Sequence, residues 1–465
     1  MKPNGMRVLV LGLGESGLAM AQWLARRGEK VRAADTRQVP PSAAELAHTA
    51  PAVELVTGPF ALSLLDDVGL VALSPGLSQT EPVVQEAYRR GIPLTGEIEL
   101  FAQALRDLGW RENCKVIAIT GTNGKTTVTS LVGAMGRAAG MNTAVAGNIS
   151  PAALTELMAR LDANDPPGLW VLELSSFQLE TTATLAADAA VVLNISDDHL
   201  DRYAGLDGYA AAKARVFEGG GVQVLNRADE RVMAMRRAGR RVFTFGLDRP
   251  PEEFDFGVVE HAGEHWLARG TEPLAALYEL PLAGLHNAAN ALAALALCRA
   301  VDLPLPPVLR ALQTFRGLAH RVQKVAEFGG IAFYDDSKGT NVGATLAALQ
   351  GLGRKVALIA GGEGKGQDFS PLKAAVEAHA RAVVLIGRDA LLIESAIQGA
   401  APPVLHAADM DEAVRTAFAA ARPGDAVLLS PACASFDMFR NYAHRAEVFV
   451  AAVRALAPAK EWKWS

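Results

Sequence analysis

The fold of the central part of this chain is decided by the stretch Val116-Ile117-Ala118-Ile119-Thr120-Gly121-Thr122-Asn123-Gly124-Lys125-Thr126-Thr127. A short apolar, β-branched run leads into a glycine-bearing turn, and a helical pattern follows the turn. This order is typical of a P-loop, in which backbone N–H groups at a helix N-terminus surround a phosphate. The stretch therefore predicts a nucleoside triphosphate site, with a threonine hydroxyl beside the lysine placed to bind Mg²⁺.

The loop is shorter than the usual P-loop. Ile119 occupies the position, five residues before Gly124, where the general pattern has a glycine. This departure argues against an ordinary GTPase or kinase. The residues predicted to contact ATP within the loop are Gly121, Thr122, Asn123, Gly124, Lys125, Thr126 and Thr127.

Length and composition indicate a multidomain enzyme. The chain has 465 residues, half of them apolar, and a formal net charge of −5, which is enough for about three domains. The sequence has no cluster of basic residues of the kind that binds nucleic acid, and no apolar stretch is as long as a membrane span. Three scattered cysteines predict neither disulfides nor a zinc site. We expect a cytoplasmic, monomeric enzyme that binds neither nucleic acid nor a membrane.

Strand-like and helix-like segments alternate along most of the chain, which predicts an α/β protein. A polar connector at 108–113 precedes the P-loop strand, and a proline-rich region leads to Arg316-Gly317. We therefore expect a Rossmann-like N-terminal domain over residues 1–112 and a central P-loop ATPase-type α/β domain over 113–317. A Rossmann-like C-terminal domain is expected over 318–465.

A second phosphate-binding pattern lies near the N-terminus. Gly12, Gly14 and Gly17 form G-x-G-x-x-G after a strand, and Asp35 ends the next strand. A nicotinamide-dependent oxidoreductase is the direct interpretation. With a P-loop also present, the turn can instead hold a substrate attached to a nucleotide, with residues 35–37 near its uracil or sugar.

Polar residues follow the central strands. Glu173 ends one apolar strand and suits Mg²⁺ beside a triphosphate. His199 follows another strand in an acidic segment, and the Asn148 amide could bridge a phosphate and an acyl group. Lys213 lies in an alanine-rich helical segment, where its pattern alone predicts an exposed lysine.

Taken together, these segments resemble the Mur ligases, the ATP-dependent amino-acid-adding enzymes of peptidoglycan synthesis. The resemblance covers all three expected domains. Its motifs are Gly121–Thr126, Glu173-Leu-Ser-Ser-Phe-Gln178, Asp198-His199, Lys213, Leu285-His-Asn287 with Asn290, Leu318-Ala-His-Arg321, Asp335–Asn341 and Ser430–Asp437. Within the family, Gly12–Gly17, Asp35–Arg37, Ser74–Gly76 and Gly96–Glu99 favour the member that adds D-glutamate.

The resemblance implies a role for each matching position. Lys125, Glu173, His199 and Lys213 would be catalytic. Two Mg²⁺ ions would be bound by Thr126, Glu173, His199 and Lys213, the lysine as a carbamate, so the resemblance overrides the exposed-lysine prediction. Further ATP contacts would come from Asn287, Asn290, Arg321 and Asp336. D-Glutamate would be surrounded by Lys338, Thr340, Lys365, Ser435, Phe436 and Tyr442. The UDP-sugar substrate would contact Gly14, Glu15, Ser16, Asp35, Thr36, Arg37, Gly76, Asn148, Ser175 and Gln178.

The implied reaction joins D-glutamate to UDP-N-acetylmuramoyl-L-alanine through an acyl phosphate formed from ATP. Two positions depart from the family pattern: Glu363 stands where Asp is common, and Tyr442 stands where Phe is common. The alternatives are another carboxylate–amine ligase, such as a folylpolyglutamate synthase or a sister Mur enzyme, and the nicotinamide oxidoreductase. The oxidoreductase hypothesis explains neither the P-loop nor the pair formed by Glu173 and His199.

Overall fold

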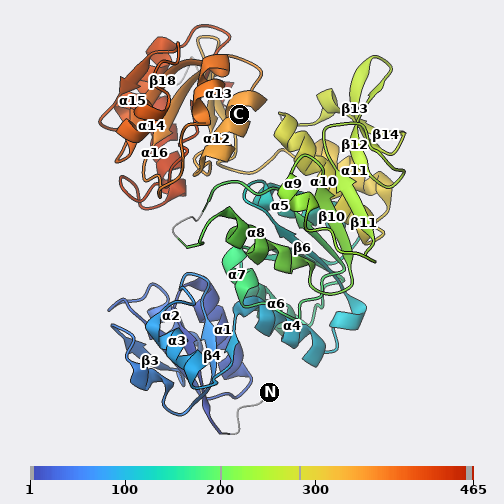
Figure 1. Ribbon diagram of the computed structural model, residues 1–465, viewed down its shortest axis with the longest axis vertical. Coiled ribbons are helices and arrows are strands. Elements are labelled where there is room, and N and C mark those ends of the chain that lie inside the picture. Colours follow the sequence, from blue (N-terminus) through green and yellow to red (C-terminus); the bar gives the residue numbers. More distant parts are fainter. Residues whose placement is uncertain (1–4, 199–201, 282–283, 457–462, 465) are drawn as a thin grey trace.

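The computed structural model describes residues 5–198, 202–281, 284–456 and 463–464. It contains three α/β units that follow one another along the long axis of the molecule (Figure 1). Each unit has its own sheet, and buried aliphatic side chains cover the sheet faces. None of the helices described is long and apolar enough to cross a membrane.

The N-terminal unit is a five-stranded parallel sheet in the order β3-β2-β1-β4-β5. Its strands are short apolar runs, as expected for a parallel sheet with helices on its faces. The strands are β1 (Arg7–Leu11), β2 (Val31–Asp35), β3 (Glu54–Thr57), β4 (Val68–Leu73) and β5 (Leu94–Thr95). The helices are α1 (Glu15–Arg26), α2 (Ala43–Thr49), α3 (Pro82–Arg89) and α4 (Glu97–Asp107).

The middle unit is a nine-stranded sheet in the order β14-β13-β12-β11-β10-β9-β6-β8-β7, parallel from β7 to β12. Its first strands are β6 (Lys115–Thr120), β7 (Thr143–Gly147), β8 (Leu169–Glu173), β9 (Ala189–Val192), β10 (Val222–Asn226) and β11 (Val242–Phe245). Its helices are α5 (Lys125–Ala138), α6 (Ala153–Asp162), α7 (Ser176–Glu180), α8 (Leu206–Ala214), α9 (Glu230–Met233), α10 (Leu285–Ala300) and α11 (Leu305–Thr314).

An antiparallel meander at the edge of this sheet has no counterpart in the predicted strands. It consists of β12 (Phe256–His261), β13 (Glu264–Arg269) and β14 (Glu272–Ala276). A two-residue turn joins β12 to β13, and both of its residues, Ala262 and Gly263, have positive φ. This is the geometry of a tight β-hairpin turn. Each strand mixes buried, partly buried and exposed residues, so the meander lacks the continuous buried apolar runs that are typical of the parallel strands.

The C-terminal unit is a seven-stranded sheet in the order β19-β18-β17-β20-β16-β15-β21, with β15 and β21 antiparallel to their neighbours. The Rossmann-like prediction therefore holds for its parallel part. The strands are β15 (Gln323–Phe328), β16 (Ile331–Asp335), β17 (Val356–Gly361), β18 (Ala380–Ile386), β19 (Val404–His406), β20 (Ala426–Leu429) and β21 (Lys463–Trp464). The helices are α12 (Val342–Gly351), α13 (Leu372–His379), α14 (Ala390–Ala396), α15 (Met410–Ala420) and α16 (Tyr442–Ala455).

The carboxyl ends of two sheets approach each other. β6, β8 and β9 end beside the P-loop, and β16 and β20 end at the loops that begin near residues 336 and 430. In open α/β sheets ligands bind at such ends. The space between the middle and C-terminal units is therefore the place to look for a site.

Candidate active site

The P-loop runs from the end of β6 into α5, as the sequence predicted. Gly124 begins the helix with φ +82°, and a Cβ there would lie 2.5 Å from Oδ1 of Asn290. Gly121 has φ +151°, and its Cβ would lie 2.9 Å from Cβ of Leu193. Only glycine fits both conditions without strain. The turn is thus held tightly against the end of β9 and the start of α10.

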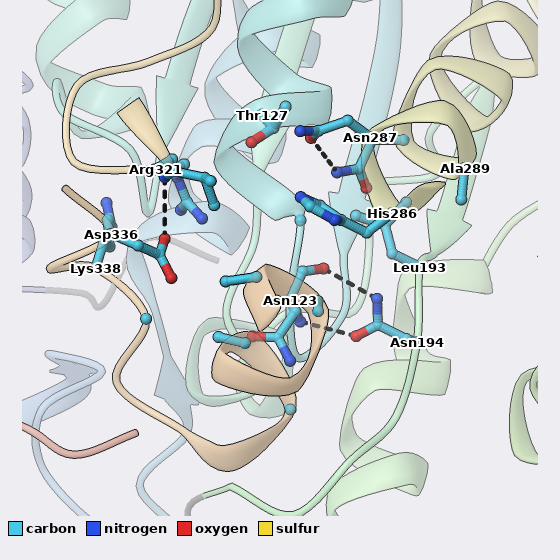
Figure 2. A pocket seen from close by; sticks show the side chains of 18 of the residues that line it. Asn123, Thr127, Leu193, Asn194, His286, Asn287, Ala289, Arg321, Asp336 and Lys338 are labelled. Carbon is cyan, nitrogen blue, oxygen red and sulfur yellow. Dashed lines mark hydrogen bonds between the residues drawn. The ribbon is translucent and has the colours of Figure 1, made fainter. Parts of the chain in front are cut away.

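Asn194, just beyond β9, fixes the P-loop backbone. Its Oδ1 accepts a hydrogen bond of 2.8 Å from the Asn123 N–H, and its Nδ2 donates to the Asn123 carbonyl at 3.2 Å (Figure 2). The Thr122 hydroxyl donates to the Ser196 carbonyl and accepts from the Ser196 N–H. These bonds hold the loop in one conformation before any phosphate arrives.

A cavity of about 330 Å³ opens between the P-loop and the C-terminal unit. Figure 2 shows Asn123, Thr127 and Asn287 on one side of it and Arg321, Asp336 and Lys338 on the other. Other lining residues are Gly124, Leu193, Asn194, Asn226, Phe245, His286, Ala289, Asn290 and Gly339. The cavity thus combines a helix N-terminus, apolar walls and polar groups from two domains, which is typical of a small-molecule site.

Two lysines lie behind the loop, Lys125 partly buried and Lys213 fully buried. Nζ of Lys125 donates to the carbonyls of Gly121 and Thr122, both at 2.8 Å. Nζ of Lys213 donates to the Gly121 carbonyl at 3.0 Å and lies 4.5 Å from the ring centroid of Tyr209. Burial lowers the pKa of both lysines, and the Lys125 charge lowers that of Lys213 further. The exposed position that the helical pattern alone predicted for Lys213 is wrong, because α8 turns this residue toward β6.

Glu173 is buried at the end of β8, with 2 % of its surface exposed. Oε1 accepts a hydrogen bond of 2.7 Å from Nδ2 of Asn148, while Oε2 has no partner among the described residues. A buried carboxylate oxygen without a donor is costly unless a cation satisfies it. The pair formed by Glu173 and the nearby Thr126 hydroxyl suits a hard divalent ion.

The remaining predicted metal ligand, His199, lies outside the described residues. Across the part of the chain that the structure describes, no three His, Cys, Asp or Glu side chains form a metal-binding cluster. Of the predicted ligands, the described residues therefore include the Glu173 carboxylate, the Thr126 hydroxyl and Lys213, which would bind a cation through the oxygens of a carbamate.

Arg321 connects the two domains at the P-loop. Its Nη2 donates a 2.6 Å hydrogen bond to Oγ1 of Thr126. Asp336 is buried beside it, accepting from the Ser430 hydroxyl at 2.7 Å and from the Val322 N–H at 3.2 Å. Burial raises the pKa of Asp336 to about 7. A carboxyl group in this state can either accept or donate a hydrogen bond near neutral pH.

The residues predicted to surround D-glutamate come from three segments of the C-terminal unit. Nζ of Lys338 lies 4.9 Å from the ring centroid of Tyr442. Ser435 is buried and Phe436 is exposed, on the loop after β20. Thr340 lies partly buried beyond Lys338, and Lys365 lies exposed after β17 with φ +53°. Lys338 alone of these lines the cavity described above.

The N-terminal glycine turn opens α1 as predicted, with Gly14 as the residue before the helix. A Cβ at Gly17 would lie 1.8 Å from the Gly12 carbonyl oxygen, so the helix and strand touch there. Asp35 is buried; its carboxylate accepts from the Leu13 N–H at 2.7 Å and from the Arg37 guanidinium at 2.6 Å. These bonds lower the pKa of Asp35 to about 2. Ser16 is partly buried, and Thr36 and Gly76 are exposed.

Three other residues that were predicted to contact the sugar substrate form hydrogen bonds within the protein in this conformation. The Glu15 carboxylate accepts from the Ser150 hydroxyl and the Ala152 N–H, which links α1 to the start of α6. Ser175 and Gln178 form a capping box at the start of α7. Their contacts with substrate stay predictions.

The sequence analysis assigned no role to three residues that shape the cavity, although His286 and Asn341 lie within the family motifs. His286 packs between Gly284 and Gly351, a Cβ on either of which would lie within 3.0 Å of its ring. Asn341 caps α12 and donates to Oδ1 of Asn123 at 3.1 Å. The position of Asn194 just after a strand could have indicated its role. His286 and Asn341 act through contacts with another domain, which leave no pattern in the neighbouring sequence.

Comparisons with known proteins agree along the chain. The Mur ligase MurD-like N-terminal domain matches residues 6–96, the Mur ligase middle domain 119–298, and the Mur ligase glutamate ligase domain 320–433. A UDP-N-acetylmuramoylalanine–D-glutamate ligase of Aromatoleum aromaticum is 61% identical over 97% of this chain and 98% of its own length. The chain belongs to the Mur ligase family. A ligase of the same name from Nitrosospira multiformis is 57% identical over 99% of this chain and 98% of its own length.

A solved structure supports the fold of this Mur ligase. The UDP-N-acetylmuramate–alanine ligase of Thermotoga maritima aligns with a TM-score of 0.61 at 20% identity, covering 97% of this chain and all of that one. This structure confirms the predicted three-part α/β fold, and the family matches and high-identity relatives confirm the ligase class. The nicotinamide oxidoreductase hypothesis is wrong, because the N-terminal turn belongs to a Mur ligase domain.

Proposed function

We propose that this Mur ligase joins D-glutamate to UDP-N-acetylmuramoyl-L-alanine, using ATP, in the synthesis of peptidoglycan precursors. The observation that supports this most directly is the P-loop opening into a cavity shared by two domains. Cationic groups of Lys125, Arg321 and Lys338 lie close enough to influence one another there. Relatives named for this reaction share 55% to 61% identity over nearly their whole lengths.

The first chemical step needs little covalent help from the protein. The alanyl carboxylate attacks the γ-phosphorus of ATP, and the bond between this phosphorus and the β–γ bridging oxygen breaks. The products are an acyl phosphate and ADP, which is the leaving group. The N-terminus of α5 and the Lys125 ammonium neutralise the developing charge. To do so, Lys125 exchanges its bonds to the Gly121 and Thr122 carbonyls for phosphate oxygens.

The second step forms the amide bond. The D-glutamate amine, after losing a proton, attacks the acyl carbon, and phosphate leaves with the oxygen it received from the carboxylate. Lys338 and Lys365 offer ammonium groups for the two glutamate carboxylates, and Ser435 offers a hydroxyl. Because these residues lie on the C-terminal unit, the amino acid would approach the acyl phosphate from across the domain gap.

Magnesium fits the residues around the P-loop. Glu173 and Thr126 would hold it, together with His199 and a carbamate on Lys213. Bound there, Mg²⁺ would supply charge neutralisation on the triphosphate. The lowered pKa of Lys213 favours its neutral amine, which is the form that reacts with carbon dioxide to give a carbamate.

One assay tests the reaction and its specificity. Phosphate release from ATP is measured with UDP-N-acetylmuramoyl-L-alanine present and D-glutamate, L-glutamate or meso-diaminopimelate offered in turn. We expect release that depends on D-glutamate alone. Release with meso-diaminopimelate but not with D-glutamate would instead assign the chain to a sister reaction of the family.

A matched pair of variants links the activity to the site. Lys125→Met removes the P-loop ammonium, and Lys115→Met removes an exposed lysine at the opposite end of β6. Phosphate release should fall by at least about a hundredfold in the first variant, because a charge aimed at the transition state is lost. The second variant should behave as the parent enzyme.

A further inference from the structure

An arginine remote from the P-loop joins the loops of the proposed amino-acid site. Arg445 lies in the second turn of α16 and is fully buried, with none of its surface exposed. Burial lowers the pKa of its guanidinium to about 10, so the group stays charged at neutral pH. A buried cation is costly, and one retained in a domain core needs strong hydrogen bonds.

The guanidinium donates hydrogen bonds to two loops. Nε donates to the Ser337 hydroxyl at 3.0 Å, and Nη2 donates to the Ser337 carbonyl at 2.7 Å. Nη1 donates to the Cys433 carbonyl at 3.1 Å. The loops are 336–340, which follows β16, and 433–436, which follows β20. We call them the acceptor loops, because they hold Lys338 and Thr340 on one side and Ser435 and Phe436 on the other.

The same network reaches the first residue of α16. The Ser337 hydroxyl, which accepts from Arg445, donates in turn to the Tyr442 carbonyl at 2.7 Å. The Tyr442 ring packs against Nζ of Lys338. The planar guanidinium offers donors in a fixed fork, which fixes both the distance and the orientation of the groups it binds.

We propose that Arg445 is a positioning residue for the incoming amino acid: it locks the two acceptor loops in register so that Lys338 and Ser435 face the same substrate. This inference rests on the proposed function. Arg445 itself is fully buried and does not line the cavity. Asp336, at the start of the first loop, is held separately by Ser430 and Val322. Loss of the arginine therefore disturbs the amino-acid side of the site more than the nucleotide side.

The test separates the Michaelis constants for the two ligands. In Arg445→Lys the charge remains but the fork is lost, and the KM for D-glutamate should rise by about tenfold or more. The KM for ATP should change by less than about threefold, since the Asp336 anchors remain. Ser337→Ala removes one partner of the guanidinium without touching the charge, and it should raise the KM for D-glutamate in the same direction by less.

Arg381→Met is the control for a general loss of stability. Arg381 forms an ion pair with Asp425 at 2.8 Å. The pair lies at the N-terminal ends of β18 and β20, whereas the acceptor loops follow the C-terminal ends of β16 and β20. This variant should unfold at a lower temperature with both KM values unchanged. Equal changes in both KM values in Arg445→Lys, or an unchanged KM for D-glutamate, would overturn the inference. Absence of D-glutamate-dependent activity in the parent enzyme would instead overturn the proposed function first.

Discussion

At the scale of single residues, the unpaired oxygen of Glu173 links the energetics of the fold to the proposed chemistry. The carboxylate is buried with one hydrogen bond, from Asn148, where a group of its charge would normally need several. Such an arrangement is costly in the ligand-free protein. It becomes favourable when a cation enters.

Glu173→Gln should therefore separate stability from activity. The neutral amide removes a buried charge but also its attraction to the Lys125 and Arg321 cations, so we expect a nearly unchanged unfolding temperature without ligands. We also expect phosphate release to fall by on the order of a hundredfold or more. Thermal unfolding and the phosphate assay measure the two effects. We expect MgATP to raise the unfolding temperature of the parent enzyme, and this rise should be smaller in the variant.

Glu156→Gln serves as the matched control, because Glu156 lies on α6 in a partly buried ion pair with Arg160, away from the P-loop. It should keep both activity and the MgATP-dependent stabilisation. A marked loss of stability in Glu173→Gln without ligands would contradict the interpretation, since it would show that the charge stabilises the fold.

The sequence predicted the residues of the P-loop well because they obey a local rule. Strand, glycine turn and helix are neighbours in the chain, and Gly121 and Gly124 occupy backbone conformations that favour glycine. Lys213 could not be placed in this way. Three alanines precede it, so the apolar face of α8 is ambiguous, and only packing against β6 determines that the lysine is buried.

At the scale of elements, the contact between α4 and α6 has an unusual centre. Glu97, the first residue of α4, is buried, and its Oε1 accepts from the Leu154 N–H in the first turn of α6 at 2.8 Å. Glu15 of α1 approaches the same helix start through the Ala152 N–H. Burial, with a smaller contribution from the Glu15 charge, raises the pKa of Glu97 from 4.5 to about 7.

This pKa predicts how stability depends on pH. The folded protein binds a proton on Glu97 that the unfolded chain has released, so its stability falls as pH rises from about 4.5 to about 7. Glu97→Gln cannot ionise. At pH 8 it should be more stable than the parent by on the order of 1–3 kcal/mol, and at pH 5 the two should be nearly equal.

Urea unfolding at the two pH values measures the difference. Glu45→Gln, an exposed position on α2, should show no such pH-dependent gain. Equal stabilities of parent and Glu97→Gln at pH 8 would show that the carboxylate is well solvated or well paired.

Strand prediction succeeded or failed according to burial. The apolar runs at Arg7–Leu11, Val242–Phe245 and Ala426–Leu429 predict strands, and β1, β11 and β20 have these bounds. The β12–β14 meander was not predicted, because its apolar and polar residues alternate little and because each of its strands mixes buried and exposed positions at a sheet edge. Its hairpin turn at Ala262-Gly263 was the available signal.

At the scale of the whole molecule, few side chains among the described residues form hydrogen bonds between the middle and C-terminal units. Arg321 reaches Thr126, and Asn341 reaches Asn123. These interdomain hydrogen bonds cannot be predicted from sequence, because the residues lie some 200 positions apart and either domain could fold without them. The predicted domain boundaries at 112 and 317 stay predictions.

Asn341→Ser should loosen the domain arrangement while leaving the C-terminal unit intact. Serine retains the N-cap of α12, which Asn341 now provides to the Ala344 N–H, but it is too short to reach Asn123. We expect an unchanged unfolding temperature and a rise in the KM for ATP of about two- to fivefold, the value of one hydrogen bond. Small-angle scattering should show a larger radius of gyration without nucleotide.

Asn441→Ser is the parallel change at the N-cap of α16, where Oδ1 accepts from the His444 N–H at 2.8 Å. It should alter neither the KM for ATP nor the scattering. If both variants behave alike, the bond between Asn341 and Asn123 does not contribute to domain closure.

The bond from Arg321 to Thr126 means that this enzyme contains a competitor for its own nucleotide. The guanidinium occupies the hydroxyl that a phosphate-bound cation would approach, so nucleotide entry exchanges one partner of Thr126 for another. The measured affinity then reports a difference between two sets of bonds and understates the strength of the new contacts. Inhibitors that fill the cavity beside His286 and stop short of Thr126 avoid this exchange and retain more of their contact energy as affinity.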